Sequence, residues 1–176
     1  MTKLIFFDTD CLSSFLLVNR RFLLTHLFKG RIIVPVATAN EIFSKPPFLF
    51  LISEFKKFVN EAEVEIRDID NHTEESKLYF ELTQNPSFAI GKGEAAAIVL
   101  AKQLNGILAS NNYADVSRFV REFHLEHIST DLILMEALQR GLIDERTGNS
   151  IWKEMLARSI KLPPGSFSDF LKNHKH

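Results

Sequence analysis

The sequence predicts a three-layer α/β/α fold, in which helices cover both faces of a central parallel sheet of four or five strands. Short continuous apolar runs at 4–7, 32–34 and 107–109 are typical of strands buried on both faces. Segments with helical spacing of apolar residues alternate with these runs, which favours parallel strands joined by helices. The 176 residues are 45% hydrophobic and 24% charged, so the chain can bury a core and is not disordered.

In the first half of the chain, glycine and proline mark where the helices end. A helical stretch runs from about 11 to 28, with a break expected near Asn19, and Gly30 is placed to end it. The strand at 32–34 leads into a helix over 36–44, which the following proline pair stops. The spacing of apolar residues then predicts, in order, a helix over 48–59, a weak strand over 64–66 and a polar-faced helix over 73–82.

The second half repeats this alternation. Gly91 and Gly93 open a helix over 94–104 that is almost wholly apolar at its centre, so we expect it to be buried. The next elements are, in order, a strand at 107–109, a turn at 110–115, a helix ending at 123 and a candidate edge strand at 125–128. Helical segments close the chain at 130–140 (capped by Thr130), 144–159 and 167–171. We expect one domain over 1–176, with about 130–176 as its helical extension.

Composition and charge exclude several classes of protein. The 21 Lys and Arg and 22 Asp and Glu residues give a net charge of −1, so nucleic-acid contact must be local. The single cysteine, Cys11, excludes an internal disulfide framework and a multi-cysteine zinc site. No targeting signal is recognisable, and no apolar run approaches the roughly 20 residues that cross a bilayer. We therefore expect a cytoplasmic protein without a membrane segment.

Acidic and polar residues fall at or beside the carboxyl ends of the predicted strands, where functional residues of open α/β sheets gather. Asp8 and Asp10 follow the first strand directly, and Glu41 and Glu94 lie on helices. A further polar cluster follows the strand at 107–109: Ser110, Asn111, Asn112 and Asp115.

Each of these residues also has a structural explanation. A strand-end Asp commonly caps the next helix, which could explain Asp8, and we expect Asp10 to be peripheral, as a cap or an exposed residue. Glu94 could simply complement the positive end of its helix. Asn111 and Asn112 suit a turn without any function.

Three motifs in order, LIFFDTD, ANEI and GKGEAAAIVLAKQLNGILASNN, resemble the PIN-domain nucleases, particularly VapC-type toxins, over nearly the whole chain. The acidic positions of that family are matched by Asp8, Glu41 and Glu94, and the match around Glu94 is the most specific. The segment HISTDLILMEALQRGLID is similar to members with an extra helical hairpin. The resemblance implies a metal-dependent endoribonuclease that cleaves single-stranded RNA, the toxin-like component of a toxin–antitoxin pair.

The resemblance also implies a site for Mg²⁺ or Mn²⁺, which prefer hard oxygen ligands. Such an ion can activate water and stabilise charge on a phosphate. One position departs from the family pattern, because Asn111 and Asn112 stand where many members have an acidic pair, and Asn brings no charge. Asp115, one helical turn on, could restore that charge. The implied catalytic residues are therefore Asp8, Glu41, Glu94 and Asp115. The implied metal ligands are Asp8, Glu94, Asp115 and Asn112.

Substrate and partner contacts are predicted around these motifs. We expect Lys92, Arg118 and Ser110 to bind substrate, the two cations by contacting phosphates. The resemblance implies a small antitoxin protein. We expect the helix at 48–59 to pack mainly in the core, and exposed apolar surface around it is the predicted docking area for an antitoxin helix or a second subunit. The apolar residues of the helix at 48–59 are Phe48, Leu51, Phe55 and Phe58. Self-association into a homodimer is a further possibility that the sequence leaves open.

Two other interpretations stay open. The motif FFDTD also resembles the haloacid-dehalogenase phosphatases, in which the first Asp is a nucleophile. That class needs a later Gly-Asp motif with further acids, whereas the late segment here is SNNYADV, with one acid. The Asn pair could instead indicate a PIN fold that binds RNA or a partner without cutting.

Overall fold

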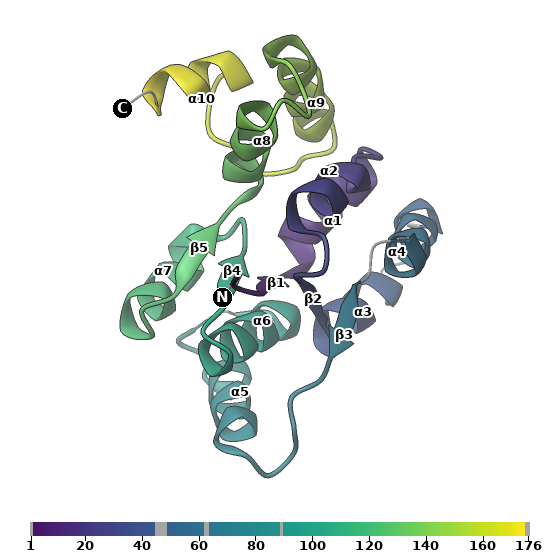
Figure 1. Cartoon of the computed structure of the whole chain (residues 1–176). Coiled ribbons are helices and arrows are strands. Elements are labelled where there is room, and N and C mark those ends of the chain that lie inside the picture. The colour runs from purple at the N-terminus through teal and green to yellow at the C-terminus, as the bar shows by residue number, and fades with distance from the viewer. Residues whose placement is uncertain (1, 45–48, 62–63, 89, 175–176) are drawn as a thin grey trace.

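The computed structural model contains one all-parallel, five-stranded sheet with the strand order β3-β2-β1-β4-β5 (Figure 1). It describes residues 2–44, 49–61, 64–88 and 90–174. The strands are β1 (Ile5–Phe7), β2 (Ile32–Pro35), β3 (Glu65–Arg67), β4 (Ile107–Ala109) and β5 (Glu126–Ile128). The predicted fold class is confirmed, and both weak strand candidates are real strands at the two edges of the sheet.

The helices follow the predicted order. They are α1 (Thr9–Leu17), α2 (Arg21–Phe28), α3 (Val36–Phe43), α4 (Leu49–Glu61), α5 (Glu74–Gln84), α6 (Lys92–Gln103), α7 (Tyr113–Glu122), α8 (Thr130–Gln139), α9 (Glu145–Ala157) and α10 (Phe167–Asn173). Asn19 separates α1 from α2 with a left-handed φ of 55°, a conformation that Asn tolerates better than most residues. At the start of α8 the prediction was wrong by one residue, because Ser129 and not Thr130 occupies the N-cap position.

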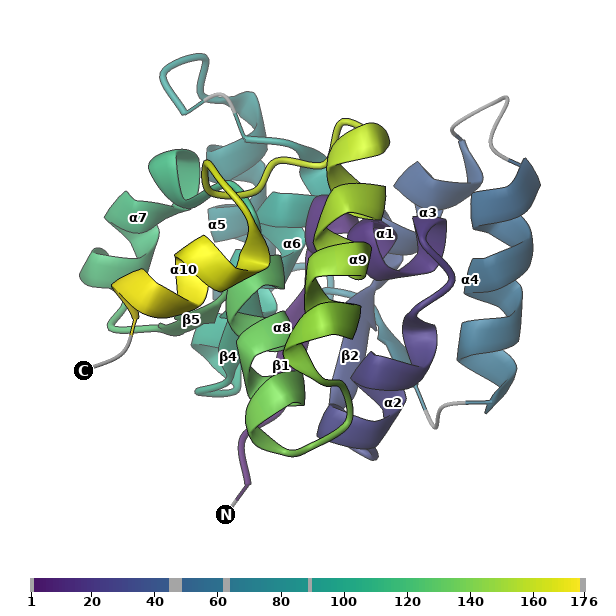
Figure 2. The ribbon, with the colours of Figure 1, turned by 90° about the horizontal axis from the view of Figure 1, so that it is seen from above.

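Side chains of the sheet alternate between two hydrophobic cores, which makes three layers. Phe7 and Val34 face a core shared with α1, α2, α4, α8, α9 and α10. Phe6 and Ile33 face the opposite core, built with α5, α6 and α7. The predicted burial of α6 is confirmed, since all its residues from Ala95 to Ala101 are buried. The view from above shows α8 and α9 on the side of the sheet that carries α1 and α2 (Figure 2).

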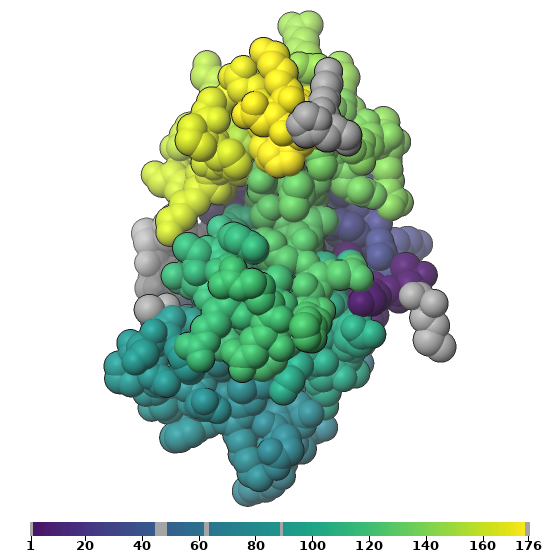
Figure 3. All heavy atoms as spheres, turned by 90° about the vertical axis from the view of Figure 1, so that its left-hand side faces the viewer, coloured from purple at the N-terminus to yellow at the C-terminus, as the bar shows by residue number. Residues whose placement is uncertain are grey.

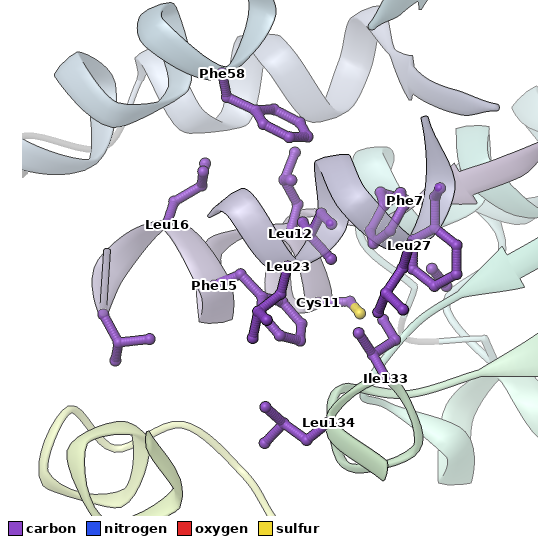
Figure 4. Packing of buried hydrophobic residues seen from close by; sticks show 14 of the residues in the cluster. Phe7, Cys11, Leu12, Phe15, Leu16, Leu23, Leu27, Phe58, Ile133 and Leu134 are labelled. Atoms are coloured by element: carbon purple, nitrogen blue, oxygen red, sulfur yellow. The ribbon is translucent and has the colours of Figure 1, made fainter. Parts of the chain in front are cut away.

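The apolar face of α4, around which the docking area was predicted, is part of the core. Leu51, Phe55 and Phe58 are buried, and Phe58 points toward Leu12 of α1 (Figure 4), whereas Phe48 lies outside the described residues. Fully burying a Leu or Phe side chain stabilises a fold by about 1.5–3 kcal/mol, so this face is not available to a partner. The exposed apolar side chains nearby are those of Phe43, Leu49 and Phe50.

The last three helices pack onto the core that the N-terminal helices build. The ring centroid of Trp152 in α9 lies 5.7 Å from that of Phe167 and 5.5 Å from that of Phe170, and these aromatic contacts pack α10 against α9. In the space-filling view this C-terminal segment (yellow) lies at the opposite end of the molecule from α5 (Figure 3). Among the helices of the described segments, none is long and apolar enough to span a membrane.

The order of the strands determines where a site can form. From β1 the chain first proceeds to β2 and β3 on one side and then returns to β4 on the other side of β1. The strand order therefore reverses between β1 and β4. In open α/β sheets, ligands bind beyond the carboxyl ends of the strands at such a point. Asp8 follows β1 and Ser110 follows β4, directly at this position.

Candidate functional site

A small pocket of about 150 Å³ lies at this reversal point. The residues that line it come from α1, α3, α6 and the turn after β4: Asp8, Thr9, Asp10, Glu41, Gly91, Glu94 and Asn112. The structure thus brings together three acids that are distant from one another in sequence, Asp8, Glu41 and Glu94. It also places the N-terminal ends of α1 and α6 at the pocket, where the helix dipoles favour negative charge.

Asp8 is both a helix cap and a pocket residue. Its Oδ1 accepts a hydrogen bond of 2.7 Å from the backbone N–H of Cys11, which makes Asp8 the N-cap of α1, and its side chain is only 2% exposed. The helix starts two residues earlier than predicted. Asp10 therefore lies inside the first turn, exposed, and the alternative in which Asp10 caps the helix is wrong. Asp10 lines the pocket from its rim.

Ser110 lies beside the two buried carboxyl groups of the pocket, those of Asp8 and Glu94. Its hydroxyl donates a 3.3 Å hydrogen bond to Oε1 of Glu94 and accepts a 3.2 Å bond from the backbone N–H of Asn112. It also lies close enough to Asp8 to lower the pKa of that carboxyl group. A hydroxyl has one proton, so Ser110 can donate to only one of two ionised carboxylates at a time. Because Ser110 is fully buried, the predicted direct contact with substrate does not fit the structure.

Ionising both Asp8 and Glu94 in the metal-free pocket is unfavourable. Burial, together with a smaller effect of the charge of Asp10, raises the pKa of Asp8 to about 7. Burial, together with the charges of Asp8, Asp115 and Asp10, raises the pKa of Glu94 to about 8. The hydrogen bonds from Ser110 oppose both shifts without cancelling them. Without a cation, the pocket therefore favours protonated carboxyl groups near neutral pH.

Glu41 is held in place by two donors that the sequence did not reveal. Its Oε1 accepts a 2.8 Å hydrogen bond from the backbone N–H of Gly93, and its Oε2 accepts one from the Thr9 hydroxyl. A Cβ atom at Gly93 would lie 2.5 Å from the Thr9 hydroxyl oxygen and 2.7 Å from Oε2 of Glu41. Only glycine leaves room for this arrangement, so the second glycine of GKGE was the available signal for it.

The polar cluster after β4 is arranged differently from the prediction. Asn112 lines the pocket, but its Nδ2 donates to Oδ2 of Asp115, which does not line the pocket and acts on Glu94 only through its charge. Asn111 is structural. Its Nδ2 donates to the Ser14 hydroxyl at 3.0 Å, and its Oδ1 accepts from the backbone N–H of Thr130 at 3.0 Å.

The two cations predicted to bind substrate lie away from the pocket lining. The Arg118 guanidinium lies 4.9 Å from the ring centroid of Phe88 and pairs with Glu122 at 3.6 Å. These contacts direct it along α7, so the predicted role at the pocket does not fit. Lys92 is the first residue of α6 and is exposed, beside the pocket but not in its wall.

The pocket offers two carboxyl groups, and not a larger ligand set, to a hard divalent cation. Within the part of the chain that the structure describes, no three His, Cys, Asp or Glu side chains are placed to hold a metal ion together. Asp8 and Glu94 nevertheless form a pair of carboxyl groups whose repulsion a cation would relieve. Mg²⁺ commonly uses one or two carboxylates and keeps several waters, so this pair fits such an ion. The larger predicted ligand set, with Asp115 and Asn112, is not assembled.

The raised pKa values predict a pH dependence of stability for the metal-free protein. Asp8 and Glu94 ionise near pH 4 in the unfolded chain but near 7 and 8 in the folded protein. Between these limits the folded state binds more protons, so the free energy of unfolding should fall by several kcal/mol as pH rises from 4 to 8. Urea unfolding in EDTA measures this, and Glu94→Gln should flatten the profile. A profile identical in the parent and Glu94→Gln would contradict the prediction.

The comparison with known protein families agrees with this geometry. A family model described as a PIN domain, DUF3368, matches residues 4–176 of the chain. Among curated proteins, no sequence matches the chain. PIN domains are typically nucleases, and they usually use divalent metals. Because the match extends over nearly the entire chain, and the sheet has the parallel order described above, this protein belongs to the PIN-domain family.

Proposed function

We propose that the protein is a Mg²⁺- or Mn²⁺-dependent endoribonuclease that cleaves single-stranded RNA. One observation carries the proposal: two buried carboxyl groups, Asp8 and Glu94, line one pocket beside Ser110, at the point where the strand order of a PIN domain reverses. Keeping two carboxylates buried together is unfavourable, so a pair of this kind is typical of a functional site. Two residues of the pocket lining, Asp10 and Gly91, are exposed, so the pocket reaches solvent and a phosphate can approach it.

Different residues of the pocket would have different roles in this reaction. Asp8 and Glu94 would hold the cation, which when bound supplies an activated water and stabilises negative charge on the phosphate. Glu41, positioned by Thr9 and Gly93, keeps a third carboxylate at the rim, where it can orient a water. The N-terminal ends of α1 and α6 direct backbone dipoles at the pocket and so favour the approach of a phosphate.

Membership of the PIN family favours this proposal over a haloacid-dehalogenase phosphatase. A PIN fold that binds without cutting is the remaining alternative, and the Asn112 side chain, uncharged and bonded to Asp115, is the observation in its favour. Incubation of an unstructured RNA with the purified protein and Mn²⁺, followed by gel separation, tests the proposal. Cleavage that disappears in EDTA supports it. Binding of the RNA without cleavage at any Mn²⁺ concentration would favour the alternative.

Substitutions of Asp115 and Asn112, where the sequence departs from the family pattern, should change the Mn²⁺ concentration needed for cleavage in opposite directions. Asp115→Asn removes a charge that acts on Glu94, so a higher Mn²⁺ concentration should be needed for half-maximal cleavage. Asn112→Asp adds a carboxylate to the pocket wall and should lower that concentration, by roughly threefold to tenfold. Titration of Mn²⁺ against the cleavage rate measures both. If Asp115→Asn behaves like the parent, Asp115 only supports the turn through Asn112.

The toxin-like role is the second part of the proposal. A single-strand ribonuclease without restraint would stop growth, so expression of the parent in a bacterial host should arrest growth, and Glu94→Gln should not. The matching partner is a small antitoxin protein that binds and inhibits this chain, while self-association into a homodimer is the alternative assembly. Equal growth of cells expressing the parent and Glu94→Gln, at equal protein levels, would refute the toxin-like role.

A further inference from the structure

A second cavity, of about 230 Å³, lies beside the acidic pocket. Asp10 and Asn112 line both, so whatever occupies one lies next to whatever occupies the other. One wall is a single face of α1, where residues 10, 13, 14 and 17 recur at helical spacing. The segment from Arg158 to Lys161, which follows α9, also lines the cavity.

A tight turn after α9 brings the segment from Arg158 to Lys161 into the lining of this cavity. Ser159 adopts a left-handed φ of 59°, and the backbone N–H of Ile160 donates to the carbonyl of Met155 at 3.1 Å. This turn ends α9 and reverses the chain direction. It leaves Arg158, Ile160 and Lys161 along the cavity. The helical extension at the end of the chain therefore contributes directly to the surroundings of the acidic pocket.

The chemistry of the walls suits a nucleotide. Arg158 and Lys161 form no ion pair with any residue that the structure describes. The Arg158 guanidinium lies 6.0 Å from the ring centroid of Phe50, a contact that does not neutralise its charge, so both cations can pair with an anion. Leu17, Leu51 and Ile160 supply apolar surface between these cations and the polar face of α1. A phosphate pairs with the cations, and a base or ribose packs on apolar side chains.

An unpartnered hydroxyl adds an independent observation. Ser13 lines the cavity and is only 7% exposed, and its hydroxyl oxygen has no hydrogen-bond partner among the described residues. A buried hydroxyl without a partner is unfavourable in a folded protein, and such groups call for an explanation. The neighbouring Ser14 differs, because its hydroxyl donates to the carbonyl of Asp10 at 2.7 Å and accepts from Asn111. A polar group of a bound ligand would complete the hydrogen bonding at Ser13.

We infer that this cavity binds one nucleotide of the single-stranded substrate, next to the phosphate that lies in the acidic pocket. Arg158 and Lys161 contact its phosphates, and the apolar side chains contact its base or ribose. The inference rests on the proposed function for the identity of the substrate. A cavity of this size, lined by α1 and by the segment after α9, accepts a single unpaired nucleotide and excludes the stacked pairs of a duplex.

Binding measured without metal tests the inference independently of cleavage. The probe is a short fluorescein-labelled oligouridylate in EDTA, with fluorescence anisotropy as readout. The double variant Arg158→Gln/Lys161→Gln should raise Kd by at least about tenfold, since two charge-assisted contacts are lost. The dependence of log Kd on log salt should become shallower by about 1.4, the value for two phosphate contacts to a single strand.

The matched control removes the same charges from α9 outside the cavity. Arg146 and Lys153 are exposed and do not line it, so Arg146→Gln/Lys153→Gln should leave Kd within about twofold of the parent. An abasic oligomer with the same phosphates should bind several-fold more weakly, because it offers no base to the apolar wall. The inference is overturned if both double variants bind alike, if the abasic oligomer binds as well, or if the parent does not bind. Failure of the parent to cleave in Mn²⁺ would instead refute the proposed function.

Discussion

Asp8→Asn is expected to abolish metal-dependent RNA cleavage and, at pH 8, to stabilise the metal-free protein. The loss of rate should be at least about a hundredfold, because one of the two buried carboxylates that face the cation is removed. The gain in stability arises because burial and nearby charge raise the pKa of Asp8 to about 7, so its ionised form is held at a cost at pH 8. We expect the free energy of unfolding to rise by on the order of 2 kcal/mol.

The shape of the side chain makes this a clean test. Asn is also a good N-cap, and its side-chain oxygen can still accept from the backbone N–H of Cys11, so α1 should start at the same residue. Asp10→Asn is the matched control, since Asp10 is exposed at the rim and should change both quantities little. Cleavage rates in Mn²⁺ and urea unfolding in EDTA give the two readouts. A cleavage rate in Asp8→Asn close to that of the parent would exclude Asp8 from the catalytic site.

Gly93→Ala is expected to have the second-largest effect, although it adds only one methyl group. That Cβ would lie 2.5 Å from the Thr9 hydroxyl oxygen and 2.7 Å from Oε2 of Glu41, both closer than real Cβ contacts. Glu41 must then move and lose its bond from the Gly93 backbone or from Thr9. We expect a destabilisation of about 1–3 kcal/mol and a cleavage rate at least about tenfold lower.

Gly91→Ala is the matched control, because it also replaces a glycine beside Glu41 but creates no steric clash. A Cβ at Gly91 would lie 3.7 Å from Oε1 of Glu41, an ordinary contact, and its φ of −70° suits any residue. We therefore expect Gly91→Ala to fold and cleave nearly as the parent does. Thermal unfolding and single-turnover cleavage of the two variants decide the matter. Equal behaviour of both variants would mean that the position of Glu41 does not depend on the space at Gly93.

The sequence by itself was enough to predict the layers of the fold and the approximate place of the candidate site. Continuous apolar runs such as 32–34 are diagnostic because a strand covered on both faces needs apolar residues at every position. The break at Asn19 was predictable because local turn chemistry produces it. The meeting of Asp8, Glu41 and Glu94 in one pocket followed from a general rule, since the carboxyl ends of parallel strands lie at the same edge of a sheet.

Only the tertiary structure decided what each polar side chain contacts. Whether Ser110 meets a substrate or lies beside Asp8 and Glu94 depends on its burial by elements distant in sequence. The direction of Arg118 depends on the ring of Phe88, which precedes it by thirty residues. The cavity between α1 and the segment after α9 exists only because the end of the chain packs beside its beginning. Local propensities fix strands, helices and their order, whereas such contacts depend on packing between distant segments, which the local sequence pattern does not encode.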